Sequence, residues 1–168
     1  YLSDLKLILQ YLDISDCDME KGSLRCDANI SLRPVGDKML GTKAELKNMN
    51  SFKAVKTALE FEIKRQSQSL EAGIRIIQET RLWDEKNQAT FSMRSKEEAH
   101  DYRYFPEPDL PPFTFTDLEI DEIRKTLAEL PQARLKRFVS SFGLPFKDAG
   151  VLIADKELAD FFEECLKF

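Results

Sequence analysis

The chain has 168 residues, and its 25 Lys and Arg against 30 Asp and Glu give a formal net charge of −5. Hydrophobic residues make up 42% and charged residues 33%, a composition typical of globular protein domains. The mild acidity disfavours a non-specific DNA-binding protein, which usually carries a basic excess. No apolar run approaches the ~20 residues of a membrane span. We therefore expect neither DNA nor a membrane as a partner.

The cysteine and histidine content is typical of a protein from a reducing compartment. Cys17, Cys26 and Cys165 are an odd number without a Cys-x-x-Cys pair, and His100 is the single histidine. This pattern disfavours a disulfide framework and a Cys/His zinc site, so we expect reduced thiols and a cytoplasmic location. Because Tyr1 leads directly into a helical pattern, we also expect the chain to be an internal fragment of a longer protein.

A helix and a β-hairpin are predicted for the beginning of the chain. Residues 2–12 place four apolar side chains at helical spacing, namely Leu5, Ile8, Leu9 and Leu12. Residues 23–33 alternate strictly between apolar and polar side chains, as a half-buried strand does. Pro34 and Gly36 mark a turn, after which residues 40–48 return as an antiparallel partner. We expect three apolar positions of the first strand to be buried: Cys26, Ala28 and Ile30.

A long helix and a second hairpin follow. Asn50 or Ser51 can cap a helix that ends near Gly73. Its predicted apolar seam comprises Phe52, Val55, Leu59, Ile63 and Leu70. Residues 74–83 and 89–94 then form the two arms of a second predicted hairpin, joined by a polar turn.

The pattern changes near residue 116. Ser95 and Glu98 form the capping-box pattern of a short helix, and the prolines of residues 102–112 favour an extended segment. Helical patterns alone follow residue 116. We therefore expect an α+β fold, with an antiparallel-sheet part over residues 1–115 and an all-α segment over residues 116–168.

Helix signals are clear in the last segment. Thr116 and Glu119 form a second capping box, Pro131 can begin a helix and Gly143 can end it. The final helix has an apolar stripe of Leu158, Phe161, Phe162, Cys165 and Leu166. The basic side chains between residues 124 and 137 either contact an RNA backbone or form a solvated helix face.

The polar side of the first hairpin is the most informative candidate site. It comprises Arg25, Asp27 and Asn29 on one strand and Lys43, Glu45 and Lys47 on the other, with Glu20 in the preceding loop. Carboxylates interleaved with cations suit Mg²⁺ held beside phosphate groups. A charged sheet face left in water explains the same pattern, and the spacing leaves both explanations open. The chain contains no Walker loop, no Gly-x-Gly-x-x-Gly and no Gly-x-Ser-x-Gly.

Five stretches, in order along the whole chain, resemble the B subunits of the aspartyl/glutamyl-tRNA amidotransferases. They are MEKGSLRCDANIS at 19–31, GTKAELKNMNS at 41–51, QETRLWD at 78–84, MRSKEEAHDYRYFPEPDLP at 93–111 and DKELADFFE at 155–163. The resemblance implies a heterotrimer of an amidase (A), which releases ammonia from glutamine, a B subunit, which modifies misacylated tRNA, and a small third component (C). The B subunit uses ATP and Mg²⁺ to phosphorylate the side-chain carboxylate of Glu-tRNA(Gln) or Asp-tRNA(Asn), and ammonia then displaces the phosphate.

The resemblance also implies domains and site residues. Residues 1–115 resemble the later part of the family's cradle, or kinase, domain, and residues 116–168 the start of its helical tRNA-binding domain. Glu20 and Glu45 fall in the two motifs that supply metal-binding carboxylates in the family. Arg25, Lys43, Lys47 and Asn48 are the implied ATP contacts. We expect the isolated fragment to be inactive, because the family's first metal-ligand motif is not in it. The alternative is a scaffold module that binds RNA or a partner and has no chemistry of its own.

Overall fold

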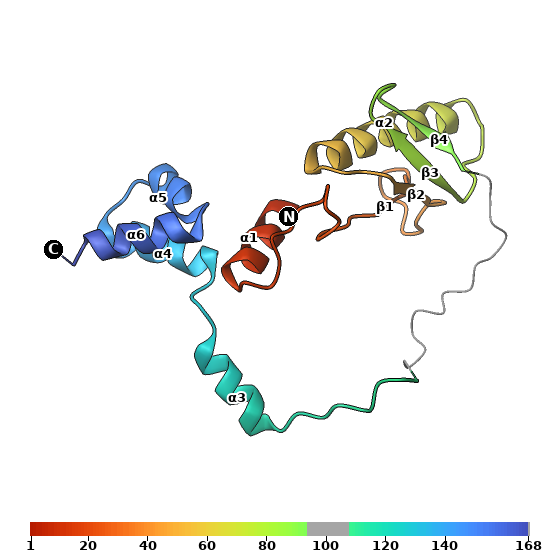
Figure 1. Cartoon of the computed structure of the whole chain (residues 1–168). Coiled ribbons are helices and arrows are strands. Elements are labelled where there is room, and N and C mark those ends of the chain that lie inside the picture. The colour runs from red at the N-terminus through yellow and green to blue at the C-terminus, as the bar shows by residue number, and fades with distance from the viewer. Residues whose placement is uncertain (94–107, 168) are drawn as a thin grey trace. The chain divides into compact units, whose positions relative to one another are not determined.

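The structure is a computed structural model that describes residues 1–93 and 108–167 (Figure 1). The chain divides into two compact units, one formed by Tyr1–Cys17 with Arg103–Phe168 and the other by Asp18–Tyr102. One four-stranded sheet and six helices are found in the described residues, which confirms the α+β class. No helix among them is long and apolar enough to cross a membrane. The predicted capping box at Ser95 and the lone His100 lie outside the described residues.

The sheet has the order β1-β2-β3-β4 and lies entirely in the unit Asp18–Tyr102. Its strands are β1 (Ala28–Ile30), β2 (Ala44–Lys47), β3 (Glu79–Asp84) and β4 (Ala89–Ser92). The pairs β1–β2 and β3–β4 are antiparallel hairpins, as predicted, whereas β2 and β3 between them are parallel. Parallel neighbours need a crossover connection, and α2 (Phe52–Glu71) supplies it by lying along one face of the sheet (Figure 1).

The first hairpin is shorter and less buried than predicted. The side chains of residues 23–30 alternate between exposed and partly buried in the predicted phase, but Cys26, Ala28 and Ile30 are only half-buried. The reason is that β1 is an edge strand, and the fully covered positions, Ala44 and Leu46, lie on β2 one strand further in. Outside the strands, Gly41 passes so close to Leu32 that a Cβ atom there would lie 2.0 Å from the Leu32 carbonyl oxygen.

The long helix begins where predicted, but its buried face differs from the predicted seam. Ser51 caps α2, since its Oγ accepts a hydrogen bond from the backbone N–H of Ala54 at 3.0 Å. Ile63 and Leu70 of the predicted seam are 46% and 45% exposed. Val55 of the seam is buried as predicted, and the other buried residues of α2 are Ala54, Ala58, Glu62 and Gln66. The buried face of α2 thus includes two polar side chains, Glu62 and Gln66, whereas two of the predicted apolar residues, Ile63 and Leu70, are exposed.

Glu62 is fully buried and links α2 to β3 and β4. Its Oε1 accepts hydrogen bonds from Arg65 Nε at 2.8 Å and from Thr90 Oγ1 at 2.5 Å, and Arg81 Nε lies 3.0 Å from the same oxygen. Gln66 Nε2 donates to Oε2 at 3.2 Å. Burial raises the pKa of Glu62, but the hydrogen bonds from Arg65, Thr90 and Gln66 outweigh it and lower the pKa below its usual value. The side chain is therefore charged although it is buried.

Replacing Glu62 tests how strongly this cluster stabilises the sheet unit. Glu62→Ala leaves Arg65 and Thr90 without the carboxylate that accepts their hydrogen bonds, so we expect it to reduce the free energy of unfolding by roughly 3 kcal/mol in urea titrations at about pH 7. Because folding lowers the pKa of Glu62, its stabilisation is present above the unfolded-state pKa and is lost as the pH falls through the folded-state pKa. The difference in the free energy of unfolding between wild type and Glu62→Ala should accordingly become smaller as the pH is lowered.

Glu60 provides the matched control on the same helix. Its side chain is 60% exposed and lies 3.8 Å from Lys56 Nζ, so Glu60→Ala should change the free energy of unfolding by no more than about 0.5 kcal/mol. Equal decreases in the free energy of unfolding for Glu60→Ala and Glu62→Ala would contradict the stabilising role of the buried Glu62 carboxylate.

The unit formed by Tyr1–Cys17 with Arg103–Phe168, called the helical unit below, contains the other five helices of the described residues. They are α1 (Leu2–Tyr11), α3 (Asp117–Thr126), α4 (Pro131–Phe142), α5 (Phe146–Ile153) and α6 (Lys156–Cys165). The predicted end signals are confirmed: Thr116 and Glu119 form a reciprocal capping box on α3, Pro131 is the first residue of α4, and Gly143 ends α4 with a φ of 67°. The predicted domain boundary near residue 116 stays a prediction.

The core of the helical unit joins α1 to helices far along the chain. Phe138, Leu135, Ala149, Ile153 and Ala159 form the buried cluster. Leu7 packs against it, and Tyr11 is only 1% exposed and donates its hydroxyl proton to the carbonyl oxygen of Ile153 at 2.9 Å. The four apolar residues predicted to share a face of α1, Leu5, Ile8, Leu9 and Leu12, are all half-buried, and Leu7 and Tyr11 add the contacts described above. On α6, Ala159 and Phe162 face the cluster, whereas Leu158, Phe161 and Leu166 are largely exposed.

The hydroxyl of Tyr11 allows a second test. Tyr11→Phe removes the partner of a buried carbonyl while keeping the ring, so we expect it to lower the free energy of unfolding by roughly 1–2 kcal/mol. Tyr1→Phe is the control, because the Tyr1 side chain is 92% exposed. Calorimetric unfolding of both variants measures the effect. If Tyr11→Phe leaves the free energy of unfolding unchanged, the hydroxyl does not hold α1 in place.

Candidate functional site

A pocket of about 460 Å³ lies where β2 ends and the chain turns toward α2. Its polar lining comprises Glu20, Lys21, Arg25, Asp27, Asn48 and Asn50, and Cys26 and Met49 contribute to its wall. Ligands of sheets with parallel strands often bind beyond the carboxyl ends of those strands, which is the position of this pocket relative to β2. Four residues predicted for the site from the sequence, Glu20, Arg25, Asp27 and Asn48, are thus brought together.

The turn that carries Glu20 is organised by Asp18. The Asp18 Oδ1 accepts hydrogen bonds from the backbone N–H of Glu20 at 2.9 Å and of Lys21 at 3.2 Å, and Lys21 Nζ lies 3.1 Å from Oδ2. The hydrogen bonds from Lys21, its side chain first, lower the pKa of Asp18. Asp18 is not among the residues predicted for the site, although an aspartate whose side chain accepts hydrogen bonds from the backbone two or three residues later is a common turn residue.

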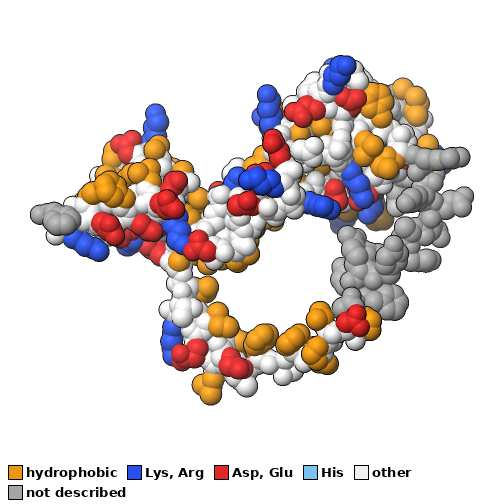
Figure 2. Space-filling view, in the orientation of Figure 1, with side chains coloured by type: hydrophobic (Ala, Val, Ile, Leu, Met, Phe, Trp, Pro, Cys, Tyr) orange, Lys and Arg blue, Asp and Glu red, His pale blue; other side chains and the backbone are white. Residues whose placement is uncertain are grey.

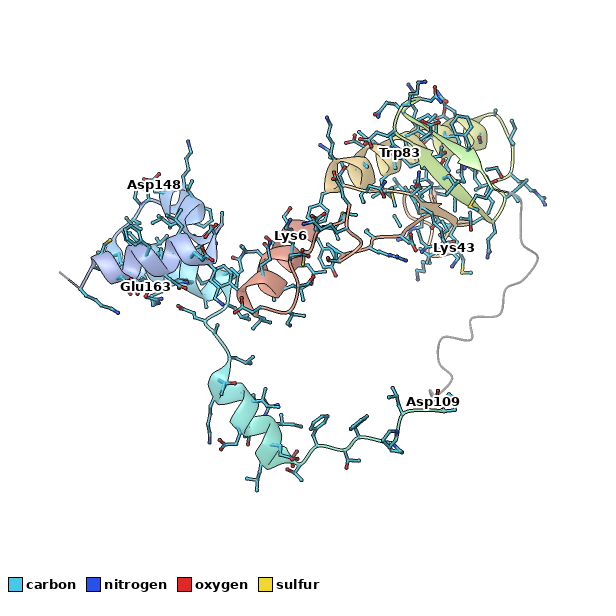
Figure 3. The ribbon with its side chains drawn as sticks, in the orientation of Figure 1. Lys6, Lys43, Trp83, Asp109, Asp148 and Glu163 are labelled. Carbon is cyan, nitrogen blue, oxygen red and sulfur yellow. The ribbon has the colours of Figure 1, made fainter. Side chains whose placement is uncertain are left out.

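Asn48 has a structural contact besides its place in the pocket wall. Its φ of 68° lies in the left-handed region, which asparagine tolerates better than most residues. Its Nδ2 donates a hydrogen bond to the carbonyl oxygen of Trp83 at 3.0 Å. Asn48 therefore ends β2 and ties it to β3. Trp83 itself is buried at the α2 side of the sheet (Figure 3). Its ring packs edge-on with that of Phe61 on α2.

Glu45 and Lys47 lie on the sheet face opposite the buried Ala44 and Leu46. Glu45 Oε2 accepts a hydrogen bond from Thr80 Oγ1 at 2.8 Å, and Lys47 Nζ lies 3.7 Å from Oε1. Asn29 is the register partner of Glu45 on β1, so the predicted polar face is present there. Lys43 is exposed just before β2. Glu45, Lys43 and Lys47 do not line the pocket that contains Glu20.

The candidate donors are hard oxygen ligands, and they are divided between the pocket, with Glu20 and Asn48, and the β1–β2 face, with Asn29 and Glu45. Glu20 and Glu45 offer carboxylate oxygens, and Asn29 and Asn48 are amides, which are hard oxygen ligands of the kind that Mg²⁺ takes together with water and phosphate. In residues 1–93 and 108–167, no group of three or more His, Cys, Asp or Glu side chains is arranged around a metal position. The metal role of Glu20 and Glu45 therefore stays a prediction.

The basic cluster of residues 124–137 is largely engaged within its own unit. Arg134 is nearly buried and lies 2.7 Å from both Asp160 Oδ1 and Glu163 Oε1. The guanidinium of Arg137 pairs with Glu163 and with Glu129. Acidic and basic side chains are interspersed in the visible surface (Figure 2). These pairs favour the structural explanation of the cluster over an RNA-binding one.

The chain is similar to proteins of one kind along its length. The family model of the GatB/GatE catalytic domain matches residues 1–121. The chain is 65% identical over 167 residues to the B subunit of the aspartyl/glutamyl-tRNA(Asn/Gln) amidotransferase of Carboxydothermus hydrogenoformans, which covers 99% of this chain and 35% of that protein. The equally named protein of Caldanaerobacter subterraneus is 59% identical over 165 residues, 98% of this chain and 35% of its own length. That of Caldicellulosiruptor saccharolyticus is 55% identical over 168 residues, with 100% and 35% covered. The chain thus spans about a third of the length of these curated relatives.

The alkylation rate of the Cys26 thiol can be used to test its position beside Asp27 in the pocket wall. Burial, and then the negative charge of Asp27, raise the pKa of Cys26, so its reactive thiolate is scarce at neutral pH. Asp27→Asn removes that charge and should therefore speed the alkylation of Cys26 at about pH 7, as followed by mass spectrometry. The exposed Cys165 is the internal control, and its rate should not change. A Cys26 rate that is insensitive to Asp27→Asn would contradict the placement of the two side chains.

Proposed function

Because the chain belongs to the GatB/GatE catalytic domain family, we propose that it is part of the B subunit of an aspartyl/glutamyl-tRNA amidotransferase and carries part of its phosphoryl-transfer site. The intact protein uses ATP and Mg²⁺ to activate the side-chain carboxylate of Glu-tRNA(Gln) or Asp-tRNA(Asn). The amidase partner supplies the ammonia, and a small third component completes a cytoplasmic heterotrimer. The observation that carries the proposal is the pocket at the end of β2, where Glu20, Arg25 and Asn48 meet.

The proposed chemistry overcomes the inertness of a carboxylate toward ammonia. A carboxylate oxygen attacks the γ-phosphorus of ATP, the bond to the β-γ bridging oxygen breaks, and ADP leaves. Ammonia then attacks the carbonyl carbon of the acyl phosphate, and inorganic phosphate leaves with the former carboxylate oxygen. The nitrogen loses a proton and the side chain becomes an amide. Positioning and charge stabilisation carry most of such a phosphoryl transfer.

Different residues of this chain have different proposed roles at the phosphoryl-transfer site. Glu20 and Glu45 would hold Mg²⁺, which would neutralise phosphate charge. Arg25 lines the pocket, and its guanidinium is the proposed partner of phosphate oxygens. Lys43 and Lys47 add positive charge along β2. Asn48 contacts the nucleotide while its amide nitrogen holds β3.

The domain assignment belongs to the same proposal. Residues 1–115 are the later part of the cradle domain, and residues 116–168 begin the helical domain that binds misacylated tRNA. The isolated chain is inactive in this proposal, since it spans 35% of its relatives' length and offers two of the metal-binding carboxylates.

A scaffold role is the second candidate, and the exposed face of α3 favours it. Every residue of α3 is exposed, including Leu118 at 79% and Ile123 at 55%, and so is Leu127 at its end, at 56%. Phe113 and Phe115, which precede the helix, are 72% and 67% exposed. Apolar side chains gathered in this way are typical of an interaction surface. The two candidates differ in whether the sheet unit performs chemistry.

Substitution of the two carboxylates separates the candidates. In the intact complex, Glu20→Gln and Glu45→Gln should each lower ATP-dependent amidation roughly 100-fold or more, because the loss of a metal ligand removes several kcal/mol of transition-state stabilisation. Glutaminase activity, measured without tRNA, should be unchanged, since that chemistry lies on the amidase partner. Glu60→Gln is the control at an exposed position of α2. Near-normal amidation by both site variants would leave the scaffold role as the better account.

A further inference from the structure

Glu45 is held by a neighbour that carries no charge. Thr80 is its register partner across the parallel pair β2–β3, so both side chains lie on the same face of the sheet. Thr80 Oγ1 donates a hydrogen bond to Glu45 Oε2 at 2.8 Å. The other carboxylate oxygen, Oε1, lies 3.7 Å from Lys47 Nζ. The two oxygens of Glu45 thus have different partners.

The position of the Thr80 hydroxyl is itself fixed from the opposite face of the sheet. The next residue, Arg81, points to the α2 side, where its Nε donates to Thr90 Oγ1 at 2.8 Å and its Nη2 to the Thr90 carbonyl oxygen at 2.8 Å. Glu62 pairs with the same guanidinium at 3.0 Å. Threonine is also stiff about χ1, because two heavy atoms branch at its Cβ. The hydroxyl therefore reaches Glu45 from a rigid strand.

This contact determines which carboxylate oxygen is available to a cation. The side chain of Glu45 is 33% exposed, so without a partner it would sample several rotamers and lose entropy on binding a ligand. The hydrogen bond from Thr80 occupies one lone pair of Oε2 and turns Oε1 toward Lys47. The Lys47 ammonium lies beyond hydrogen-bond distance from Oε1, so this pair is loose and easily replaced.

We propose that Thr80 is a positioning residue, whose hydroxyl holds Glu45 so that Oε1 takes the divalent cation in place of the Lys47 ammonium. The displaced Lys47 then turns to a phosphate oxygen, and the negative charge of Glu45 stays balanced throughout. This inference rests on the proposed metal role of Glu45. Hydrogen bonds to metal-ligating carboxylates typically change metal affinity 10–100-fold when they are removed.

Direct binding of Mn²⁺, as a stand-in for Mg²⁺, tests the inference without measuring activity. The full-length protein in its complex is titrated with Mn²⁺ in the presence of a non-hydrolysable ATP analogue, and free Mn²⁺ is followed by electron paramagnetic resonance. Thr80→Val keeps the shape of the side chain and lacks the hydroxyl, so Mn²⁺ should bind roughly 10-fold more weakly. Thr80→Ser keeps the hydroxyl and should bind as wild type does. Thermal unfolding shows whether the variants are folded, and Thr80→Ala replaces Thr80→Val if the latter is not.

Glu45→Gln, titrated in parallel, separates the metal role of Glu45 from the positioning role of Thr80. If Glu45→Gln loses Mn²⁺ while Thr80→Val retains wild-type affinity, the positioning role is wrong and the metal role of Glu45 stands. If Glu45→Gln binds Mn²⁺ as wild type does, the proposed site fails and the inference fails with it. Equal weakening by Thr80→Ser and Thr80→Val would also overturn the inference, because the hydroxyl would then not be the cause.

Discussion

The parallel register of β2 and β3 is the constraint on which the candidate site depends. It sets Glu45 directly beside Thr80 and leaves the end of β2, at Asn48, next to the start of α2. Parallel strands cannot be joined by a tight turn, so α2 has to connect β2 to β3 across the sheet. The chain that leaves the end of β2 toward α2 therefore forms one wall of the pocket. The pocket and the Thr80–Glu45 contact are thus two consequences of one strand pairing.

The buried carboxylate of Glu62 explains why this register is unique. A slip of β3 by one residue would turn every side chain of the strand to the other face, which would remove Arg81 from Glu62 and expose Trp83. Buried ion pairs contribute little net stability compared with apolar packing, yet breaking one is costly. Glu62 is satisfied by Arg65, Gln66, Arg81 and Thr90 together. Misaligned pairings would leave a buried charge without partners, so the network selects the arrangement that positions the site.

Local signals in the sequence predicted the elements better than their packing. The cap at Ser51 and the alternation around Glu45 follow from short-range chemistry, and both are present in the structure. The buried face of α2 was predicted only in part, at Val55, because Glu62 is polar and its burial depends on residues of β3 and β4. Tyr11 was missed because its partner is 142 residues away. Thr80 carries no charge and lies 35 residues from Glu45, so neither spacing nor composition identified it. For the site, the alternating polar face indicated Glu20 and Glu45 as candidates and the family resemblance assigned them a metal role, which stays a prediction.

The most direct test of the account is the position of the cation in the assembled complex. Crystals of the full complex with Mn²⁺ and a non-hydrolysable ATP analogue, measured at the manganese absorption edge, locate the metal by its anomalous signal. The account predicts a peak roughly 2 Å from Glu45 Oε1, with Thr80 still bound to Oε2, Lys47 turned away, and the nucleotide beside Arg25 and Asn48. A metal and nucleotide bound elsewhere, with Lys47 still paired to Glu45, would contradict it.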